Sequence, residues 1–320
     1  MERTALTTLL IAAALVVTAI PARAQLNGHN LKGDFGLMSG SQPPPGFYLA
    51  PAFFDYSADT LRDRDGDPIR LGPEQRGTLD ARLFAGVLWY VTDLKLFGAN
   101  VGFMAVPSFT NNSLELPVLG VASRTDTALT DLYFQPVNLG WHTPRADFTA
   151  GLGVVAPIGE YESRGSDNTG LGMWSFELYA GTTLFFDEKK SWHFATTAFY
   201  ETHTEKKDTN IEVGDILTLE GGLGKSFLEG ALSVGAAYYA QWKLSDDKLG
   251  PGFEPPANRR LGKHQVYGFG PELTLPIANR KKLFAFLNAR YFWEFGARTT
   301  SEGSSLLITA TIPIPSIPTN

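Results

Sequence analysis

Charged and amide side chains recur at alternate positions of segments that are otherwise apolar. Alternate positions share one face of a β-strand, so these side chains would point into the interior of a closed sheet. Carboxylates outnumber cations among them, which leaves two interpretations open: an ion-pair network that satisfies buried charge, or a polar path for a solute. The residues expected to line this interior are Asp80, Arg82, Asp131, Gln135, Glu177, His193, Glu201, Glu220, Lys243, Glu272, Arg290 and Glu294.

The histidines are not spaced as a barrel hydrolase would need them. A base and a nucleophile on one face of a strand require a His-x-Ser spacing, whereas Ala195 stands two positions after His193. Pro144 follows His142 at that distance, and Val266 follows His264. We therefore predict that the chain is not an enzyme.

One acidic run could bind a metal ion. Asp63, Asp65 and Asp67 have the spacing of the first half of a calcium loop, but Pro68 interrupts the run and the distal acidic ligand is missing. We predict a solvated turn here, with weak calcium bridging to lipopolysaccharide as the alternative. We expect neither a metal site nor a cofactor.

The elements that must position these residues begin after a signal peptide. The basic Arg3, the apolar run 5–20, the helix-breaking Pro21 and the Ala22-Arg23-Ala24 site have the order of a secretory signal. The apolar run is too short to span a membrane readily as a helical anchor. We predict export, with residues 1–24 removed by cleavage after Ala24.

From Gly46 onward, segments of about ten residues with period-two alternation recur about twelve times, as tilted membrane-crossing strands require. In the second segment we expect the odd-numbered residues to face lipid and Asp80, Arg82 and Gly86 to face inward. The expected strands are Phe47–Tyr56, Leu79–Val91, Gly98–Phe109, Leu129–Trp141, Ala146–Gly159, Trp174–Phe186, Trp192–Thr202, Ile216–Ser226, Ala231–Lys243, Lys263–Ile277, Leu283–Phe295 and Ser305–Pro313.

The connections between these segments alternate in length. Long polar loops such as 59–78 and 203–215 alternate with tight turns such as 143–145, the pattern of outer-membrane barrels. We predict an all-β fold: a single transmembrane antiparallel up-and-down barrel of about twelve strands over residues 46–320. A secreted soluble β-sandwich would also alternate, but it would not need strands this long.

Composition narrows the class of protein further. The chain has no cysteine, which excludes disulfides, thiolate metal sites and cysteine nucleophiles. Its 33 glycines, 22 phenylalanines and 11 tyrosines fit a barrel in which apolar outward residues alternate with small or polar inward ones. A net charge of −6 without a basic cluster argues against nucleic acid as a partner.

Residues 25–45 form a segment of their own ahead of the first strand. The segment is rich in glycine, carries apolar side chains and ends in the stiff run Pro43-Pro44-Pro45. It could fold into the lumen as a plug or remain a disordered periplasmic tether. If it gates the barrel, the residues expected to do so are His29, Phe35 and Met38.

Several groups of residues carry a resemblance to a known family. They are His29, Gly33, Gly36 and Gly40, then Pro43-Pro44-Pro45-Gly46 with Tyr48, Asp131-Leu132-Tyr133 with Pro136 and Trp141, and Gly151-Leu152-Gly153-Val154 followed by Pro157-Ile158-Gly159-Glu160-Tyr161. From about His29 to Thr311, the chain resembles the outer-membrane barrel proteins named for phenol meta-pathway degradation, which are also described as transporters. The family brings no established catalytic residues.

The resemblance implies an outer-membrane channel or transporter for passive uptake of small, aromatic or hydrophobic compounds. A solute would pass along Phe47, Phe53, Phe84 and Tyr239 and leave past the N-terminal segment. The alternative is a structural or adhesive barrel with a closed lumen and partner-binding loops. The expected partners are outer-membrane lipids and lipopolysaccharide, the barrel-assembly machinery and small solutes.

Overall fold

The computed structural model describes residues 26–69, 77–116, 121–163, 165, 167–228, 232–250, 262–278 and 283–314. The predicted signal peptide, residues 1–24, lies outside these ranges. The strands are β1 (Gly46–Leu61), β2 (Thr78–Leu96), β3 (Ala99–Val106), β4 (Ser108–Leu116), β5 (Val121–Arg124), β6 (Ala128–Leu129), β7 (Leu132–His142), β8 (Ala146–Ala156), β9 (Ser175–Phe185), β10 (Trp192–His203), β11 (Ile216–Phe227), β12 (Leu232–Lys243), β13 (Gln265–Ala278), β14 (Leu283–Arg298) and β15 (Ser301–Ile314).

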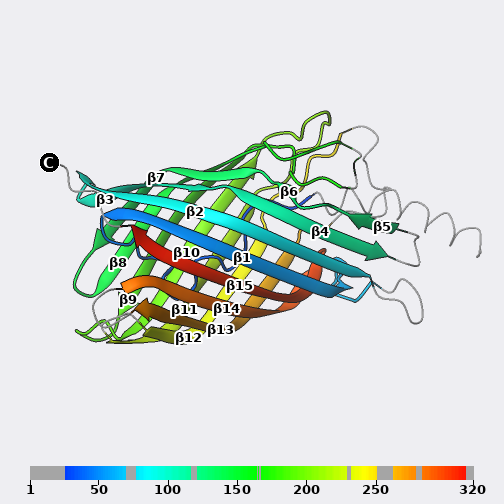
Figure 1. Cartoon of the computed structure of the whole chain (residues 1–320). Coiled ribbons are helices and arrows are strands. Elements are labelled where there is room, and N and C mark those ends of the chain that lie inside the picture. Colours follow the sequence, from blue (N-terminus) through cyan, green and yellow to red (C-terminus); the bar gives the residue numbers. More distant parts are fainter. Residues whose placement is uncertain are drawn as a thin grey trace, which may run out of the picture.

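The strands form one closed antiparallel barrel (Figure 1). β1 pairs with β2 on one side and with β15 on the other, so the first and last strands close the sheet. β3 and β4 both pair with β2 and act as two halves of a single wall strand, interrupted at Pro107, which has no N–H to give to a ladder. The short β5 and β6 pair with β4, and without them the wall has twelve strands, so the predicted all-β barrel of about twelve strands is confirmed.

Short turns and long connections lie at opposite ends of the barrel. Residues 143–145 join β7 to β8, whereas 157–174 join β8 to β9 and 204–215 join β10 to β11. We call the end with the long connections the loop end and the other the turn end. Figure 1 shows β1 running from the turn end on the left to the loop end on the right.

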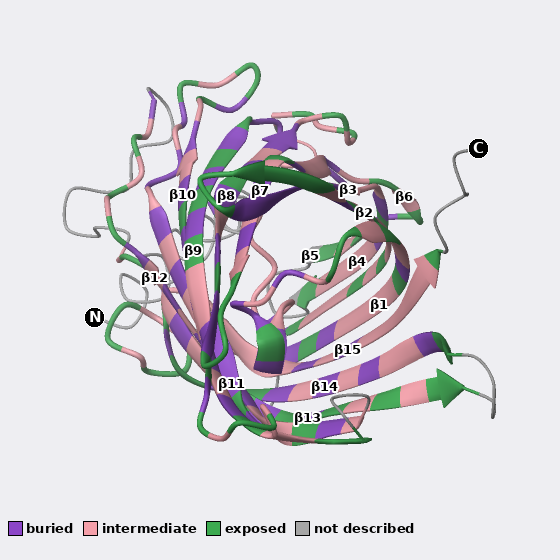
Figure 2. Cartoon of the chain, turned by 90° about the vertical axis from the view of Figure 1, so that its left-hand side faces the viewer, coloured by how far each residue is buried: buried purple, intermediate pink, exposed green. Residues whose placement is uncertain are grey.

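The outer face of the wall is apolar. In β8 and β9, the most exposed positions alternate with buried ones and carry Phe148, Leu152, Phe176 and Leu178. Figure 2 shows this alternation as stripes along the strands. A water-soluble sheet would place polar residues at these positions, so this surface is built to face lipid.

The predicted orientation of β2 is wrong. Phe84 and Leu88 are exposed on the outer face, whereas the odd-numbered Leu83 and Val87 point into the lumen. Arg82 also points outward, with 59% of its side chain exposed, and its Nε donates to Asp55 at 2.8 Å across the strand pair.

Because side chains alternate along a strand, Asp80 lies on the outer face with Arg82 and is not a lumen-lining residue either. The physical reason for the error is that β2 is apolar on both faces through its middle. Its sequence therefore contains no polar face that could fix which side points inward.

The described residues contain one short 3-10 helix, η1 (Gly36–Met38), which precedes β1. In the described part of the chain, no helix is long and apolar enough to cross a membrane.

The lipid-facing assignment makes a testable prediction at Leu152, which is 47% exposed near the middle of β8. We expect Leu152→Arg to lower the free energy of unfolding by about 2–4 kcal/mol, because a cation at the bilayer midplane must leave water. Urea unfolding from lipid vesicles, followed by gel mobility without heating, measures this. The control is Leu228→Arg in a turn between β11 and β12, and an equal loss in both variants would contradict the assignment.

Candidate functional site

The N-terminal segment lies inside the barrel. We call residues 26–45 the luminal segment. It enters at the loop end, runs along the inner wall and reaches the start of β1 at the turn end, where it is visible in Figure 1 as the dark blue trace within the strands. Of the two arrangements that the sequence left open, the structure therefore shows a segment folded into the lumen.

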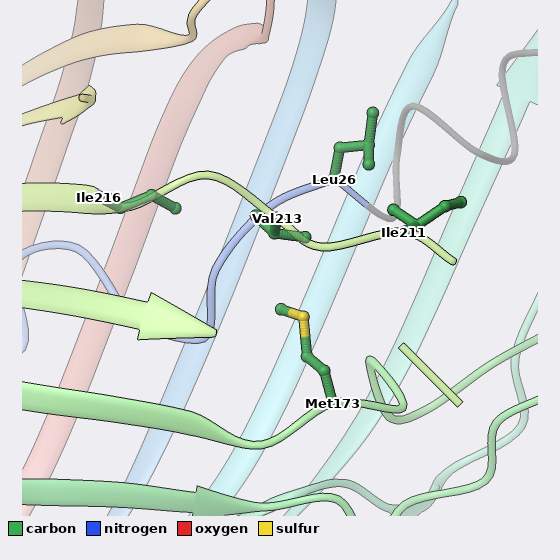
Figure 3. Close-up of a cluster of buried hydrophobic side chains, with 5 residues drawn as sticks. All are labelled: Leu26, Met173, Ile211, Val213 and Ile216. Carbon is green, nitrogen blue, oxygen red and sulfur yellow. The ribbon is translucent and has the colours of Figure 1, made fainter. Parts of the chain in front are cut away.

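At the loop end, the segment is fixed by a cluster of apolar side chains (Figure 3). Leu26 packs in this cluster with Met173, which precedes β9, with Ile211 and Val213 from the connection between β10 and β11, and with Ile216 at the start of β11. Each is less than a tenth exposed. The long connections thus converge on the first described residue of the chain.

Two buried lysines add hydrogen bonds around this cluster. Lys243 Nζ donates to the backbone oxygen of Leu26 at 2.7 Å and to Asp247 Oδ1 at 2.6 Å. Lys206 Nζ donates to the backbone oxygen of Leu171 at 2.7 Å. Burial lowers the pKa of Lys206 to about 8, because the ammonium form loses its hydration. The loop end is therefore tied together by apolar packing and by cations that bind backbone oxygens.

His29 makes the next set of contacts. Its Nε2 lies 2.8 Å from Asp131 Oδ2, its Nδ1 lies 2.7 Å from Ser175 Oγ, and its backbone N–H donates to Glu201 Oε1 at 2.7 Å. Glu201 is also approached by His203 Nε2 at 3.2 Å. This part of the segment is held by β9, β10 and the residue before β7.

The middle of the segment is held by an ion pair and by a hydrogen bond, both with side chains of β14. Lys32 Nζ lies 2.7 Å from Glu294 Oε1, and Tyr56 and Tyr239 also donate their hydroxyls to Glu294. Arg290 Nη1 donates to the backbone oxygen of Gly33 at 3.0 Å. Glu294 and Arg290, two buried charges of the wall, thus find partners on the segment, which offsets part of the free-energy cost of burying them.

Leu37 is the deepest apolar contact of the segment. It is 1% exposed, and its N–H donates to Glu272 Oε2 at 2.9 Å. Its methyl groups occupy a hollow formed by Gly222, Gly224 and Gly235, where an added Cβ would come within 2.6, 3.0 and 2.9 Å of them. Glycines in β11 and β12 therefore create the space in which the segment docks.

At the turn end, side-chain hydrogen bonds hold the segment. Ser41 Oγ donates to Asp147 Oδ2 at 2.9 Å, and Gln42 Nε2 donates to Asn138. Tyr48 of β1 donates its hydroxyl to the backbone oxygen of Pro44 at 2.7 Å. The segment is thus bound along its whole length.

A cavity of about 800 Å³ remains beside the luminal segment. The segment packs against the charged wall from β9 to β14, and the cavity lies between it and the inner faces of β1, β2, β3 and β15. Most of that opposite wall is apolar, and Tyr48, Thr309 and Thr311 are its polar members at the cavity. Its apolar side chains there are Ala50, Ala52, Phe54, Leu83, Ala85, Val87, Trp89, Met104, Val106 and Leu307.

The three residues expected to gate the barrel all line this cavity. His29 is anchored to the wall as described, Phe35 stacks on Phe199 of β10, and Met38 is 40% exposed. The luminal segment therefore presents His29, Phe35 and Met38 to whatever occupies the cavity.

Ten of the twelve residues expected to line the interior are buried in the barrel, and Asp80 and Arg82 are the exceptions corrected above. The structure brings two groups of them together through the luminal segment, one around His29 and one around Lys32 to Leu37. His193 lies beside Gly224 at the edge of the Leu37 hollow, next to Phe185. The ten are Asp131, Gln135, Glu177, His193, Glu201, Glu220, Lys243, Glu272, Arg290 and Glu294.

The apolar wall of the cavity escaped the sequence analysis, which looked for a polar interior. Of the aromatics expected along a solute path, Phe53 packs against Phe84 on the outer face with their rings tilted, and Phe47 is also exposed there. Tyr239 is inside the barrel but is bound to Glu294. The signal in the sequence that could have revealed this apolar wall is that β2 is apolar on both of its faces.

The acidic run after β1 forms a turn. Asp63 Oδ1 accepts the backbone N–H groups of Asp65 and Asp67, both at 2.9 Å. Among the described residues, no group of three or more His, Asp or Glu side chains is placed to hold a metal ion.

Comparison with known proteins identifies the family. The sequence profile of the family described as "Putative MetA-pathway of phenol degradation" matches residues 58–310. The chain belongs to this family. The resemblance found in the sequence is therefore confirmed. No curated protein matches the chain.

Solved structures of outer-membrane proteins are similar to the chain. The crystal structure of an outer-membrane channel from Pseudomonas putida F1 matches this chain with a TM-score of 0.73 and a sequence identity of 12%. The match covers 89% of this chain and 100% of the channel. The transport unit of the autotransporter AIDA-I from Escherichia coli has a TM-score of 0.48 at 10% identity, covering 92% and 98%. With its apolar exterior, the chain is an outer-membrane β-barrel.

The hollow for Leu37 makes a second prediction. We expect Leu37→Ala to weaken docking of the luminal segment by about 2–5 kcal/mol, because a buried leucine is lost and a cavity remains. The chain has no native cysteine, so a single Ser39→Cys replacement at a buried position reports undocking through its rate of maleimide labelling. Met38→Ala is the neighbouring control. Equal labelling rates in the two variants would show that Leu37 is not the anchor.

Proposed function

We propose that this protein is an outer-membrane channel for passive uptake of small hydrophobic compounds, aromatic ones among them. The observation that carries the proposal is the cavity of about 800 Å³ inside the lumen, one wall of which is made of apolar side chains. A channel for polar solutes would line its path with charged and hydroxyl groups on every side, whereas here such groups line the side of the cavity that faces β7 to β14. An apolar wall instead offers favourable contact to a solute that leaves water.

The direction of passage follows from the ends of the barrel. In outer-membrane barrels, long loops face the outside and short turns face the periplasm. A solute would enter between the long connections at the loop end and pass along Ala50, Leu83 and Val87. It would leave at the turn end, where Ser41 and Gln42 hold the luminal segment. No step of this passage needs a catalytic group.

We further propose that the luminal segment is the gate. His29, Phe35 and Met38 line the cavity along its length, so a change in the docking of the segment changes the shape of the path. The segment is held by hydrogen bonds, by ion pairs and by the apolar contacts of Leu26 and Leu37, all of which are reversible contacts. Export with cleavage after Ala24, and contact with lipopolysaccharide and the barrel-assembly machinery, belong to the same proposal.

A second candidate function is a structural or adhesive barrel with a closed lumen. The observation that favours it is the number of contacts that bind the segment to the wall, among them the pairs of Lys32 with Glu294 and of His29 with Asp131. In that case the lumen would be a packed core, and the long connections would bind a partner. Solute uptake separates the two functions.

Two neighbouring residues of β1 test the proposed channel. We expect Ala52→Trp to reduce uptake of radiolabelled ethylbenzene by cells with an intact lipopolysaccharide layer to the level of cells without the protein, because the indole fills the cavity. Phe53→Trp, which faces lipid at the next position, is the matched control and should leave uptake unchanged. Unchanged uptake in both variants would contradict the channel.

Deletion of residues 25–40 tests the gate. We expect the shortened chain to show larger conductance steps in a planar bilayer than the full mature chain, because the lumen loses the segment that fills its charged half. Gel mobility with and without heating shows whether the barrel has folded. A folded barrel with unchanged conductance would rule out the gate while leaving the cavity as a binding site.

A further inference from the structure

One aromatic side chain of the luminal segment stands where the segment meets the cavity. Phe35 stacks on Phe199 of β10 with ring centroids 5.5 Å apart and an interplanar angle of 28°. Both residues line the cavity. Phe199 in turn packs on Tyr179 of β9, its direct neighbour across the strand pair, at 5.6 Å and 31°. Phe199 is 2% exposed, so Phe35 and Tyr179 together cover it.

The side chain of Phe35 differs from the anchors on either side of it. Lys32 is held by an ion pair with Glu294, and Leu37 is held in its hollow by burial and by a hydrogen bond to Glu272. Phe35 is only half-buried and is held against the wall by its ring contact. Along the middle of the segment, the ring of Phe35 is therefore the side chain whose contact with the wall an aromatic molecule could take over.

The side chain of Phe35 can leave the wall while the backbone anchors around it stay. Gly33 and Gly36 flank it at φ values of +79° and +59°, the left-handed region that glycine adopts without strain. The ring turns about the Cα–Cβ bond of Phe35 itself, so the backbone bond from Arg290 to Gly33 and the packing of Leu37 can stay in place while it moves. The two glycine positions exclude other residues, since a Cβ at Gly36 would lie 2.0 Å from Glu272 Oε2 and one at Gly33 would lie 2.7 Å from Phe292.

We propose that the face of Phe199 is a binding site for an aromatic ring of the solute, and that Phe35 occupies it as an internal ligand until a solute displaces it. The inference rests on the proposed channel function and adds to it a site, a ligand class and a means of opening. An aromatic solute recovers the ring stacking that Phe35 gives up, whereas a saturated solute of the same size recovers only apolar contact. The site therefore selects for aromatic rings.

Equilibrium dialysis of the full mature chain in lipid nanodiscs tests the site, with empty nanodiscs as the blank. The probes are benzyl alcohol and cyclohexylmethanol, which differ in the ring alone. For the wild type we expect benzyl alcohol to bind about two- to tenfold more tightly, the range that one aromatic pair contributes. Phe199→Leu should lower this ratio to about one, because a leucine packs on both rings alike.

Phe35→Ala should raise the affinity for benzyl alcohol by about two- to tenfold, since the internal competitor is removed and the face of Phe199 remains. Phe35 lies on the segment and outside the barrel wall, so this variant tests the site even if Phe199→Leu does not fold. Phe148→Ala, on the lipid-facing side of β8, is the matched control and should behave as the wild type.

The outcomes separate the site from the channel. If Phe35→Ala binds benzyl alcohol no better than Phe148→Ala, or if a folded Phe199→Leu keeps the wild-type ratio, the aromatic site is wrong. In both cases the cavity still binds hydrophobic solutes. If neither probe binds to any variant above the level of empty nanodiscs, the proposed channel function fails as well.

Discussion

The whole structure depends on one constraint: a strand surrounded by lipid must have every backbone N–H and C=O bonded to another strand. An open sheet would leave two edges unpaired in hydrocarbon, so β1 must find β15, and the wall closes. Closure fixes an inside and an outside for each side chain. The outside must be apolar, and so the chain places its charges in the enclosed space, where they lack water.

The luminal segment resolves the problem that closure creates. Carboxylates such as Glu201, Glu272 and Glu294 cannot stay buried without donors, and the segment supplies backbone N–H groups together with Lys32 and His29. One half of the lumen is filled in this way. The other half, from β1 to β3 and β15, carries no charges to satisfy and remains a cavity with an apolar wall. The interior is thus divided by its chemistry into a docking half and a solute half.

The sequence predicted the features that depend on local pattern. The number of strands, the alternation of long and short connections and the polar inward positions of β9 to β14 follow from period-two patterning, which a strand imposes wherever one face is apolar and the other polar. The orientation of β2 could not be predicted because both of its faces are apolar. The docking of Leu37 among Gly222, Gly224 and Gly235 could not be predicted either, since it joins residues about 190 positions apart through contacts that only the closed barrel creates.

The path of the luminal segment also constrains the order in which the molecule is made. The segment runs through the barrel from one mouth to the other and continues directly into β1, one of the two strands that form the closing seam with β15. A ring that has already closed would have to be threaded from one side by a chain that carries charges and prolines. Laying the segment along β9 to β14 while the sheet is still an open ribbon avoids that passage. We therefore expect the segment to dock before the sheet is complete, so that the barrel closes around its own beginning.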